Sequence, residues 1–302
     1  GAKKRQRVMI RLTPGVEAHT HEAIKTAHED VKFGFSIASG AAWEAALRVR
    51  SEASLELVGV HAHIGSQIFV ADGFDTSAQR LIGFLAQYRN EFGSELPELN
   101  LGGGYGIAYI ESDNPISAQE MLSRLHSIVE RECSQNNLAI PKVSIEPGRA
   151  IVGPTMVTLY EVGTTKVVKD GAGQVRNYIS VDGGMSDNIR PGLYGAEYSI
   201  LLANRKSSAG AIDSRVVGKH CETGDIVIND VKLPSDIRPG DILAVPATGA
   251  YGRSMASNYN FLGRPPVVLV SEGTARTIVR RENQADLLAL DVEEAPRVIG
   301  EL

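Results

Sequence analysis

Apolar positions recur with two different rhythms along the chain. In the first half, short apolar runs at 7–12, 57–63, 98–101 and 142–146 predict strands. Between them, apolar residues at helical spacing predict helices over 39–49, 72–92 and 117–136, the last opened by a capping-box pattern at Ser117 and Glu120. Strands that alternate with helices across short connections predict a parallel α/β sheet.

The rhythm changes after about Gly153. Strand-like runs separated by turn residues then follow one another with few helices between them, at 155–168, 176–181, 212–219, 225–231, 241–245, 266–270 and 274–280. This pattern predicts a mostly antiparallel β domain. We therefore expect one domain over 7–154 and a second over 155–302.

Composition narrows the class of protein. The 302 residues hold 31 Lys plus Arg against 36 Asp plus Glu, a net charge of −5, which gives no reason to expect a nucleic-acid partner. No apolar run reaches the ~18 residues that a membrane span needs. The two cysteines, Cys133 and Cys221, are too few for a disulfide framework and favour a cytoplasmic location.

Candidate chemistry gathers where the predicted strands of the first half end. These clusters are Thr13-Pro14-Gly15, the segment 61–66 (HAHIGS), the glycines 102–104 and the segment 146–149 (EPGR). In a (β/α) barrel, the carboxyl ends of the strands form the active-site face. A glycine triplet at that face lets backbone N–H groups approach a phosphate, although glycine triplets also occur in ordinary loops.

Single residues in these clusters leave alternatives open. His63 fits either a buried core position or a ligand contact. His61 and His63 share one face of a strand, but no third ligand has suitable spacing, so we expect no metal. Glu146 closes an apolar strand and is expected to be a buried carboxylate, which needs a partner, either Arg149 or the cation of a ligand.

Six motifs together carry a family resemblance. They occur in the order HAHIGSQ (61–67), GGGYG (102–106), EPGR (146–149), DGGMSDNIRPGLYGA (182–196), GKHCETGD (218–225) and GAYGRSMASNYN (249–260). From about Val8 to about Asn283, the chain resembles the pyridoxal-phosphate decarboxylases of the alanine-racemase-like fold, and most closely their diaminopimelate-specific branch. The resemblance implies a partial TIM-type (β/α)8 barrel followed by the antiparallel β domain.

The resemblance also implies roles for individual residues. For the cofactor, pyridoxal 5′-phosphate, it implies contacts from His63, Ser66, Gly102, Gly103, Gly104, Glu146, Arg149 and Tyr251. For the substrate, it implies contacts from Arg149, Arg190, Tyr194, Glu222 and Tyr251. His63 would stack on the pyridine ring and Glu146 would hold its nitrogen, while Cys221 is a candidate proton donor after carbon dioxide leaves.

These roles suit one substrate in particular. Two arginines match a distal carboxylate, and Glu222 matches a distal ammonium. A diamine precursor would not need Arg190, so we expect decarboxylation of meso-2,6-diaminopimelate to L-lysine and carbon dioxide, a lyase step of lysine biosynthesis. In the family, Cys221 and Glu222 reach into the partner's site, so the resemblance also implies a homodimer with shared active sites.

The sequence departs from the family pattern at its most important lysine. That lysine forms the Schiff base with the cofactor and lies well before the HIGS motif. Only Lys3, Lys4, Lys25 and Lys32 precede His63, and none has the family context. We therefore expect the early barrel strands to be absent from these 302 residues and the isolated chain to be inactive or feeble.

Other functions remain open at this point. The chain could belong to a member of this family that decarboxylates another basic amino acid or carboxynorspermidine. It could instead be a lysine-less homologue that regulates a partner subunit, although such homologues rarely keep so many site residues. An amino-acid racemase is disfavoured, because that relative places an arginine where this sequence has Glu146.

Overall fold

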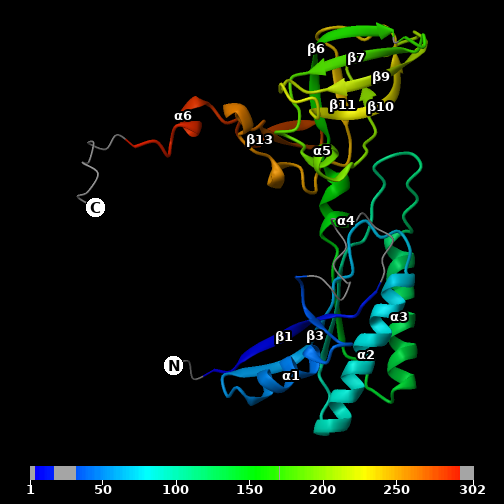
Figure 1. Ribbon diagram of the computed structural model, residues 1–302, viewed down its shortest axis with the longest axis vertical. Helices are drawn as coiled ribbons and strands as arrows, with labels where there is room; N and C mark the ends of the chain where they lie inside the picture. The colour runs from blue at the N-terminus through cyan, green and yellow to red at the C-terminus, as the bar shows by residue number, and fades with distance from the viewer. Residues whose placement is uncertain (1–3, 17–31, 170, 293–302) are drawn as a thin grey trace. The chain divides into compact units, whose positions relative to one another are not determined.

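The computed structural model describes residues 4–16, 32–169 and 171–292, so Lys3 and Lys25 lie outside the described residues. The chain forms two compact units, Gly1–Met156 and Val157–Leu302 (Figure 1). Each unit has its own sheet. Among the described residues, no helix is long and apolar enough to cross a membrane.

The first unit is built on a parallel sheet of five strands in the order β2-β1-β3-β4-β5. The strands are β1 (Gln6–Thr13), β2 (Phe35–Ser36), β3 (Leu55–His61), β4 (Glu98–Gly103) and β5 (Lys142–Glu146). β1, β3, β4 and β5 were predicted from their apolar runs, and the structure confirms them. β2 has only two residues, too few to produce a detectable period.

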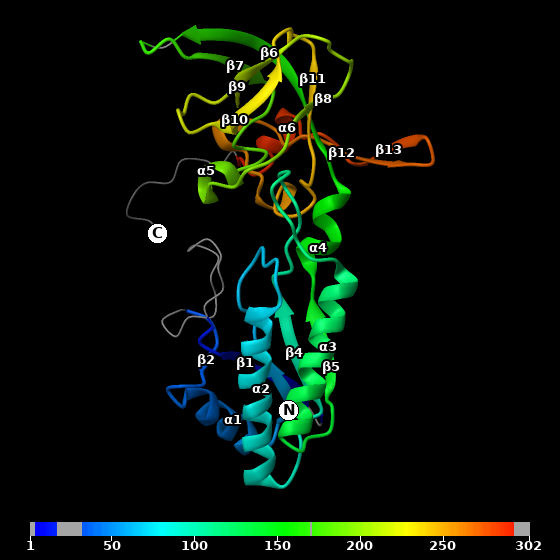
Figure 2. The ribbon, with the colours of Figure 1, turned by 90° about the vertical axis from the view of Figure 1, so that its right-hand side faces the viewer.

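Helices α1 (Ala41–Ser51), α2 (Asp72–Phe92) and α3 (Ala118–Gln135) connect these strands. Right-handed crossovers between parallel strands place successive helices on one face of a sheet, and α2 and α3 lie side by side there (Figure 2). Ser117 caps α3 by accepting the Glu120 N–H at 3.1 Å. Only this half of the predicted capping box forms, because the Glu120 carboxylate pairs with Arg124 at 2.7 Å instead.

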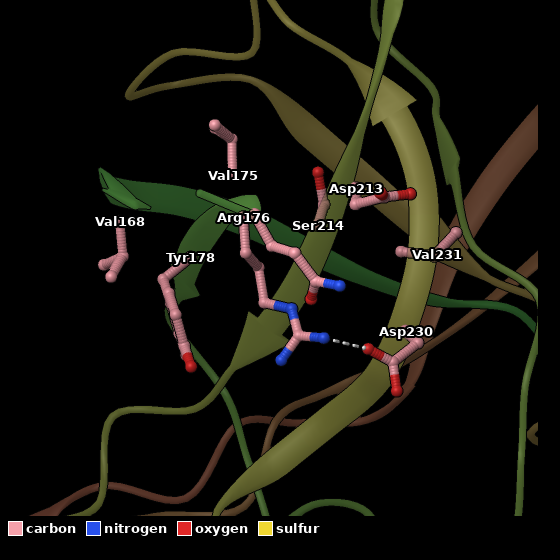
Figure 3. Close-up of a pocket in the computed structure, with 9 residues that line it drawn as sticks. Val168, Val175, Arg176, Tyr178, Asp213, Ser214, Asp230 and Val231 are labelled. Atoms are coloured by element: carbon pink, nitrogen blue, oxygen red, sulfur yellow. Dashed lines mark ion pairs between the residues drawn. The ribbon is translucent and has the colours of Figure 1, made fainter. Parts of the chain in front are cut away.

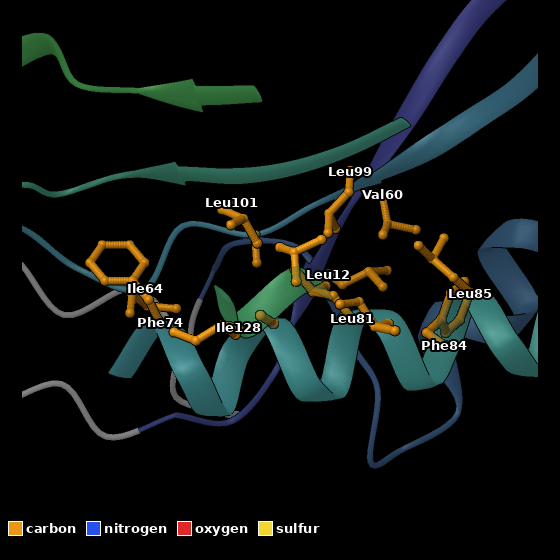
Figure 4. Close-up of a cluster of buried hydrophobic side chains, with 14 of the residues drawn as sticks. Leu12, Val60, Ile64, Phe74, Leu81, Phe84, Leu85, Leu99, Leu101 and Ile128 are labelled. Carbon is orange, nitrogen blue, oxygen red and sulfur yellow. The ribbon is translucent and has the colours of Figure 1, made fainter. Parts of the chain in front are cut away.

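An apolar core joins the helices to the sheet (Figure 4). Phe74, Leu81 and Ile82 of α2 are fully buried against Val60 of β3 and Leu99 of β4. Burying a side chain of this size contributes about 1.5–3 kcal/mol. This core covers one face of the sheet. The polar residues at the carboxyl ends of the strands are not part of it and are available to form a site. A short helix, α4 (Gly148–Val152), and a 3₁₀ turn (Gly153–Thr155) follow β5.

The second unit contains a six-stranded sheet in the order β10-β9-β7-β6-β11-β8. Its strands are β6 (Thr158–Lys169), β7 (Val175–Val181), β8 (Leu201–Leu202), β9 (Ala211–Val217), β10 (Ile226–Pro234) and β11 (Ile242–Val245). All neighbouring pairs are antiparallel except β7 with β9, so the expectation of a mostly antiparallel domain is confirmed. A hairpin follows, formed by β12 (Val267–Ser271) and β13 (Thr274–Val279) (Figure 2).

Two further details differ from the sequence predictions. β3 ends at His61, so Ala62 and His63 follow the strand instead of lying on it. β4 continues through Gly103, two residues beyond the predicted end at Leu101, because Gly103 still pairs with Glu146 of β5. The remaining helical segments of the second unit are short: α5 (Arg190–Tyr194), α6 (Gln284–Leu287) and the 3₁₀ turns η3 (Arg253–Met255) and η4 (Tyr259–Phe261).

Candidate active site

The carboxyl ends of the parallel strands bring polar side chains to one edge of the first unit's sheet. Arg11 of β1 lies opposite His61 of β3, and His61 lies opposite Asn100 of β4. Glu146, the last residue of β5, lies opposite Gly103. Strand ends in a parallel sheet meet at the same edge, and the structure brings these predicted strand ends together there. Their role in catalysis stays a prediction.

Glu146 is held by residues from two neighbouring strands. Its Oε1 accepts a hydrogen bond from Asn100 Nδ2 at 3.0 Å, and its Oε2 lies 3.3 Å from His61 Nε2. The side chain stays 50% exposed, so the sequence interpretation of a buried carboxylate is wrong. Arg149, considered as its partner, contacts other residues. Glu146 is therefore an oriented carboxylate that is still accessible to a ligand.

The ring of His63 has a fixed orientation. Its Nδ1 accepts the Gly103 N–H at 3.2 Å, so this nitrogen carries no proton when the bond forms. Burial lowers the pKa of His63, and electrostatic interactions with Arg11 and His61 lower that pKa further, against a smaller opposing influence of Glu146. His63 is therefore held as a neutral imidazole beside the glycine triplet.

Gly102–Gly104 pass very close to the loop that follows β3. A Cβ atom on Gly102 would lie 2.1 Å from Ala62 O, and one on Gly104 would lie 2.2 Å from Gly65 O. Both residues have positive φ, 72° and 106°. This close packing requires glycine whether or not a ligand binds. The predicted contact between these glycines and a phosphate therefore stays a prediction. The glycines have no side chains that would keep a phosphate away from the backbone N–H groups.

Arg149 is buried and contacts the loop that follows β3. Its Nη2 donates to Ser66 Oγ at 2.8 Å, and its Nη1 donates to the hydroxyl of Tyr109. The guanidinium carbon also lies 5.6 Å from the centre of the Tyr109 ring. Arg149 and Ser66, which the sequence assigned to the site separately, are thus in direct contact.

In the second unit, Arg190 begins α5 and is also buried, with 7% of its surface exposed. Its Nη1 donates to the Tyr198 hydroxyl, and its guanidinium lies 5.4 Å from the centre of that ring. Tyr194 ends the same helix and is partly exposed. Gly195 then ends the helix in the left-handed conformation at φ 61°.

Cys221 and Glu222 lie on the loop between β9 and β10. Cys221 is exposed, and its Sγ lies 3.5 Å from Glu222 Oε1. The Tyr259 hydroxyl donates to the same oxygen and lowers the pKa of Glu222. Glu222 is therefore held as an anion beside the thiol.

The buried carboxylate of Asp225 holds the loop between β9 and β10 in place by accepting backbone hydrogen bonds. Asp225 is 3% exposed, and its carboxylate accepts the Met185 N–H at 2.6 Å and the His220 N–H at 2.8 Å. A Cβ atom on Gly184 or Gly218 would come within 2.6 Å of that carboxylate. The GKHCETGD and DGGMS motifs are therefore joined through one buried charge.

Tyr251 lies on the loop after β11 and is 46% exposed. Its φ of 58° places it in the left-handed region, which is costly for a residue with a side chain and is common at functional sites. The hydroxyl contact to phosphate that the sequence predicts is untested.

A separate hollow of about 360 Å³ lies on the second unit's sheet (Figure 3). Arg176 and Asp230 pair across it at 2.9 Å. None of the predicted site residues lines it; its lining residues are Val168, Gln174, Val175, Arg176, Tyr178, Asp213, Ser214, Asp230 and Val231. Within the described ranges, no group of three or more His, Cys, Asp or Glu side chains could hold a metal.

Sequence reasoning missed four residues that hold the predicted ones: Asn100, Tyr109, Tyr198 and Tyr259. Tyr259 lies inside a motif that was already recognised, GAYGRSMASNYN, so a signal was available. Asn100 lies two residues before the glycine triplet and also accepts the Gly102 N–H at 2.8 Å. The two other tyrosines carry no motif that distinguishes them from core residues.

Comparison with known proteins places these residues in context. Residues 2–153 match the family "Pyridoxal-dependent decarboxylase, pyridoxal binding domain". The chain is 55% identical to a diaminopimelate decarboxylase of Mycobacterium tuberculosis over 95% of this chain and 65% of the relative. It is 46% identical to one of Bacillus subtilis over 94% of this chain and 64% of the relative. The chain thus spans about two thirds of the length of these relatives.

Solved structures agree with the sequence matches. A diaminopimelate decarboxylase from Helicobacter pylori, complexed with L-lysine, is 30% identical and superposes with a TM-score of 0.83. The match covers 95% of this chain and 67% of that one. This likeness confirms the expected fold, in which part of an α/β barrel is followed by a mostly antiparallel β unit. The chain therefore belongs to the pyridoxal-dependent decarboxylases, and its relatives at 45–55% identity are diaminopimelate decarboxylases.

Proposed function

We propose that this chain carries the cofactor and substrate residues of a lyase that decarboxylates meso-2,6-diaminopimelate to L-lysine. The observation that carries the proposal lies in the second unit, where Arg190 is buried and the pKa of Glu222 is lowered by the hydrogen bond from Tyr259. Arg149, buried in the first unit, is a second guanidinium that suits a carboxylate. These groups match a substrate whose distal end bears both a carboxylate and an ammonium. The names of the relatives, and the L-lysine in the Helicobacter pylori structure, support the same substrate class.

The residues of the first unit fit pyridoxal 5′-phosphate by the chemistry of their groups. A glycine-lined backbone suits the phosphate, the oriented ring of His63 suits stacking on the pyridine ring, and the accessible carboxylate of Glu146 suits a protonated pyridine nitrogen. When bound, the cofactor supplies an electron sink for the pair of electrons released as carbon dioxide leaves.

The protein's own groups then have distinct tasks. Asn100 and His61 orient Glu146, so its negative charge favours a proton on the pyridine nitrogen. We propose that Arg149 and Arg190 bind the distal carboxylate with charge-assisted hydrogen bonds. Cys221 would deliver a proton to the carbon from which carbon dioxide has left.

We further propose a cytoplasmic homodimer in which Cys221 and Glu222 serve the partner copy's site. Both cysteines are unpaired in the structure, which suits a reducing compartment. The exposed position of Cys221 suits a residue that meets a ligand bound by another copy of the chain.

Release of carbon dioxide from meso-diaminopimelate tests the function. The assay uses the full-length protein loaded with pyridoxal phosphate. Arg190→Ala should lower kcat/KM for diaminopimelate by about a hundredfold, the loss expected for a charge-assisted contact, and should spare any activity on L-ornithine. Arg124→Ala, at an exposed pair on α3, is the control.

The possible outcomes separate the candidates. Turnover of meso-diaminopimelate that depends on Arg190 supports the proposal. Turnover of L-ornithine or carboxynorspermidine in its place would identify another decarboxylase of the family. Cofactor binding without any turnover by the full-length protein would favour a regulatory homologue.

A further inference from the structure

The two oxygens of the Glu222 carboxylate have different surroundings. Oε1 accepts the hydroxyl of Tyr259, and the thiol of Cys221 lies 3.5 Å from it. Oε2 is buried and has no hydrogen-bond partner among the described residues. A buried carboxylate oxygen without a donor is costly and calls for an explanation. A ligand that brings its own N–H donor to Oε2 would remove that cost.

The ring of Tyr259 is itself held in place. It packs against the His220 ring, with centroids 5.4 Å apart and planes tilted by 56°. His220 Nε2 lies 2.9 Å from Ser186 Oγ, and the His220 N–H donates to the buried Asp225. The Tyr259 ring is therefore held by His220, which is in turn fixed by Ser186 and Asp225. From this fixed ring, the Tyr259 hydroxyl reaches Glu222.

We propose that Tyr259 is a positioning residue that fixes Glu222 as the receptor for the substrate's distal ammonium. It thereby sets the preference for diamino diacids over analogues that lack this ammonium. The inference rests on the proposed function and adds a residue that determines specificity. The hydroxyl keeps one carboxylate oxygen occupied, so the other remains as the acceptor for the ligand's ammonium.

The electrostatics agree with this geometry. The hydrogen bond from Tyr259 is the largest influence on Glu222 and lowers its pKa, and the same bond raises the pKa of Tyr259. Glu222 is therefore anionic when an ammonium arrives, and Tyr259 keeps its proton. Because the distal ammonium takes no part in bond breaking, the contact should act on binding and not on the chemical step.

Tyr259→Phe removes the hydroxyl and keeps the ring against His220. We expect KM for meso-diaminopimelate to rise about tenfold while kcat stays within about twofold, as for loss of a hydrogen bond to a charged group. With 2-aminopimelate, which lacks the distal ammonium, kcat/KM should not change. Tyr178→Phe, on β7, is the matched control and should leave both substrates unaffected.

Ligand binding gives a second readout that does not depend on turnover. By calorimetry, Tyr259→Phe should weaken L-lysine about tenfold and leave 6-aminohexanoate, which lacks the α-ammonium, unchanged. In a Glu222→Gln background, Tyr259→Phe should have little further effect on either ligand, because the charge that it orients is gone.

Equal losses for both members of each ligand pair, or an undiminished effect in the Glu222→Gln background, would show that Tyr259 only supports the fold. That result overturns the inference and leaves the decarboxylase intact. If the unsubstituted protein neither turns over meso-diaminopimelate nor binds L-lysine, the proposed function fails and the inference fails with it.

Discussion

At the scale of single residues, each charged group assigned to the substrate shares a hydrogen bond with a tyrosine. Arg149 donates to Tyr109 and Arg190 donates to Tyr198, while Glu222 accepts from Tyr259. A phenol hydroxyl can donate or accept, so the same side chain serves either sign of charge. It orients the group without neutralising it, so the charge stays available to a ligand.

Gly104 allows a direct test of the close packing beside His63. Gly104→Ala would place a Cβ 2.2 Å from Gly65 O at a φ of 106°, so we expect a loss of more than about 2 kcal/mol in the free energy of unfolding, with weaker pyridoxal phosphate binding. Gly83→Ala is the control, because a Cβ at this exposed position in α2 meets no atom within 4 Å. It should stabilise by about 0.5–1 kcal/mol. Urea unfolding measures the change in the free energy of unfolding for each variant. Equal changes for Gly104→Ala and Gly83→Ala would refute the steric argument.

At the scale of elements, the start of β11 is fastened by a buried ion pair. Asp241, at 2% exposure, accepts two hydrogen bonds from Arg205, at 2.8 and 2.7 Å, and one from the Arg238 N–H at 3.0 Å. Arg205 also binds Asp236 at 2.9 Å. One arginine therefore joins the segment after β8 to the turn before β11.

This pair predicts how stability depends on pH. Arg205 lowers the pKa of Asp241 to about 2, below the value of about 4 in an unfolded chain. The ionised Asp241 therefore makes its full contribution to the free energy of unfolding above pH ~4, and this contribution is lost as the pH falls through ~2. Asp241→Asn should cost about 2 kcal/mol at pH 7, and the difference from the unsubstituted chain should shrink below pH ~4. Urea unfolding at several pH values measures it; a constant difference would contradict the assignment.

The elements show what sequence could and could not supply. Helix α2 matches its predicted range of 72–92, because a long apolar period ends at Gly93, which is left-handed at φ 64°. The parallel strands were predictable, but not which residues lie opposite one another. Register brings Asn100 and His61 to Glu146, and no local pattern encodes register between strands so far apart in sequence. The partners of the site residues therefore came from the structure.

At the scale of the whole molecule, the chain has two compact units, and its single tryptophan lies in one of them. Trp43 of α1 packs against Phe84 and Phe92 of α2, with ring centroids 5.7 and 5.8 Å apart. Tryptophan fluorescence should therefore report unfolding of the first unit, while circular dichroism reports both. Units with separate cores are expected to unfold separately.

Two substitutions distinguish separate from joint unfolding. Asp241→Asn should lower the midpoint of the circular dichroism transition that belongs to the second unit and leave the Trp43 transition unchanged. Leu81→Ala, in the fully buried core of the first unit, should cost about 2–5 kcal/mol and shift the Trp43 transition. If Asp241→Asn moves the fluorescence midpoint as far as the dichroism midpoint, the units unfold as one. A substitution in the sheet of the second unit would then also destabilise the first unit, which holds the residues proposed to bind the cofactor.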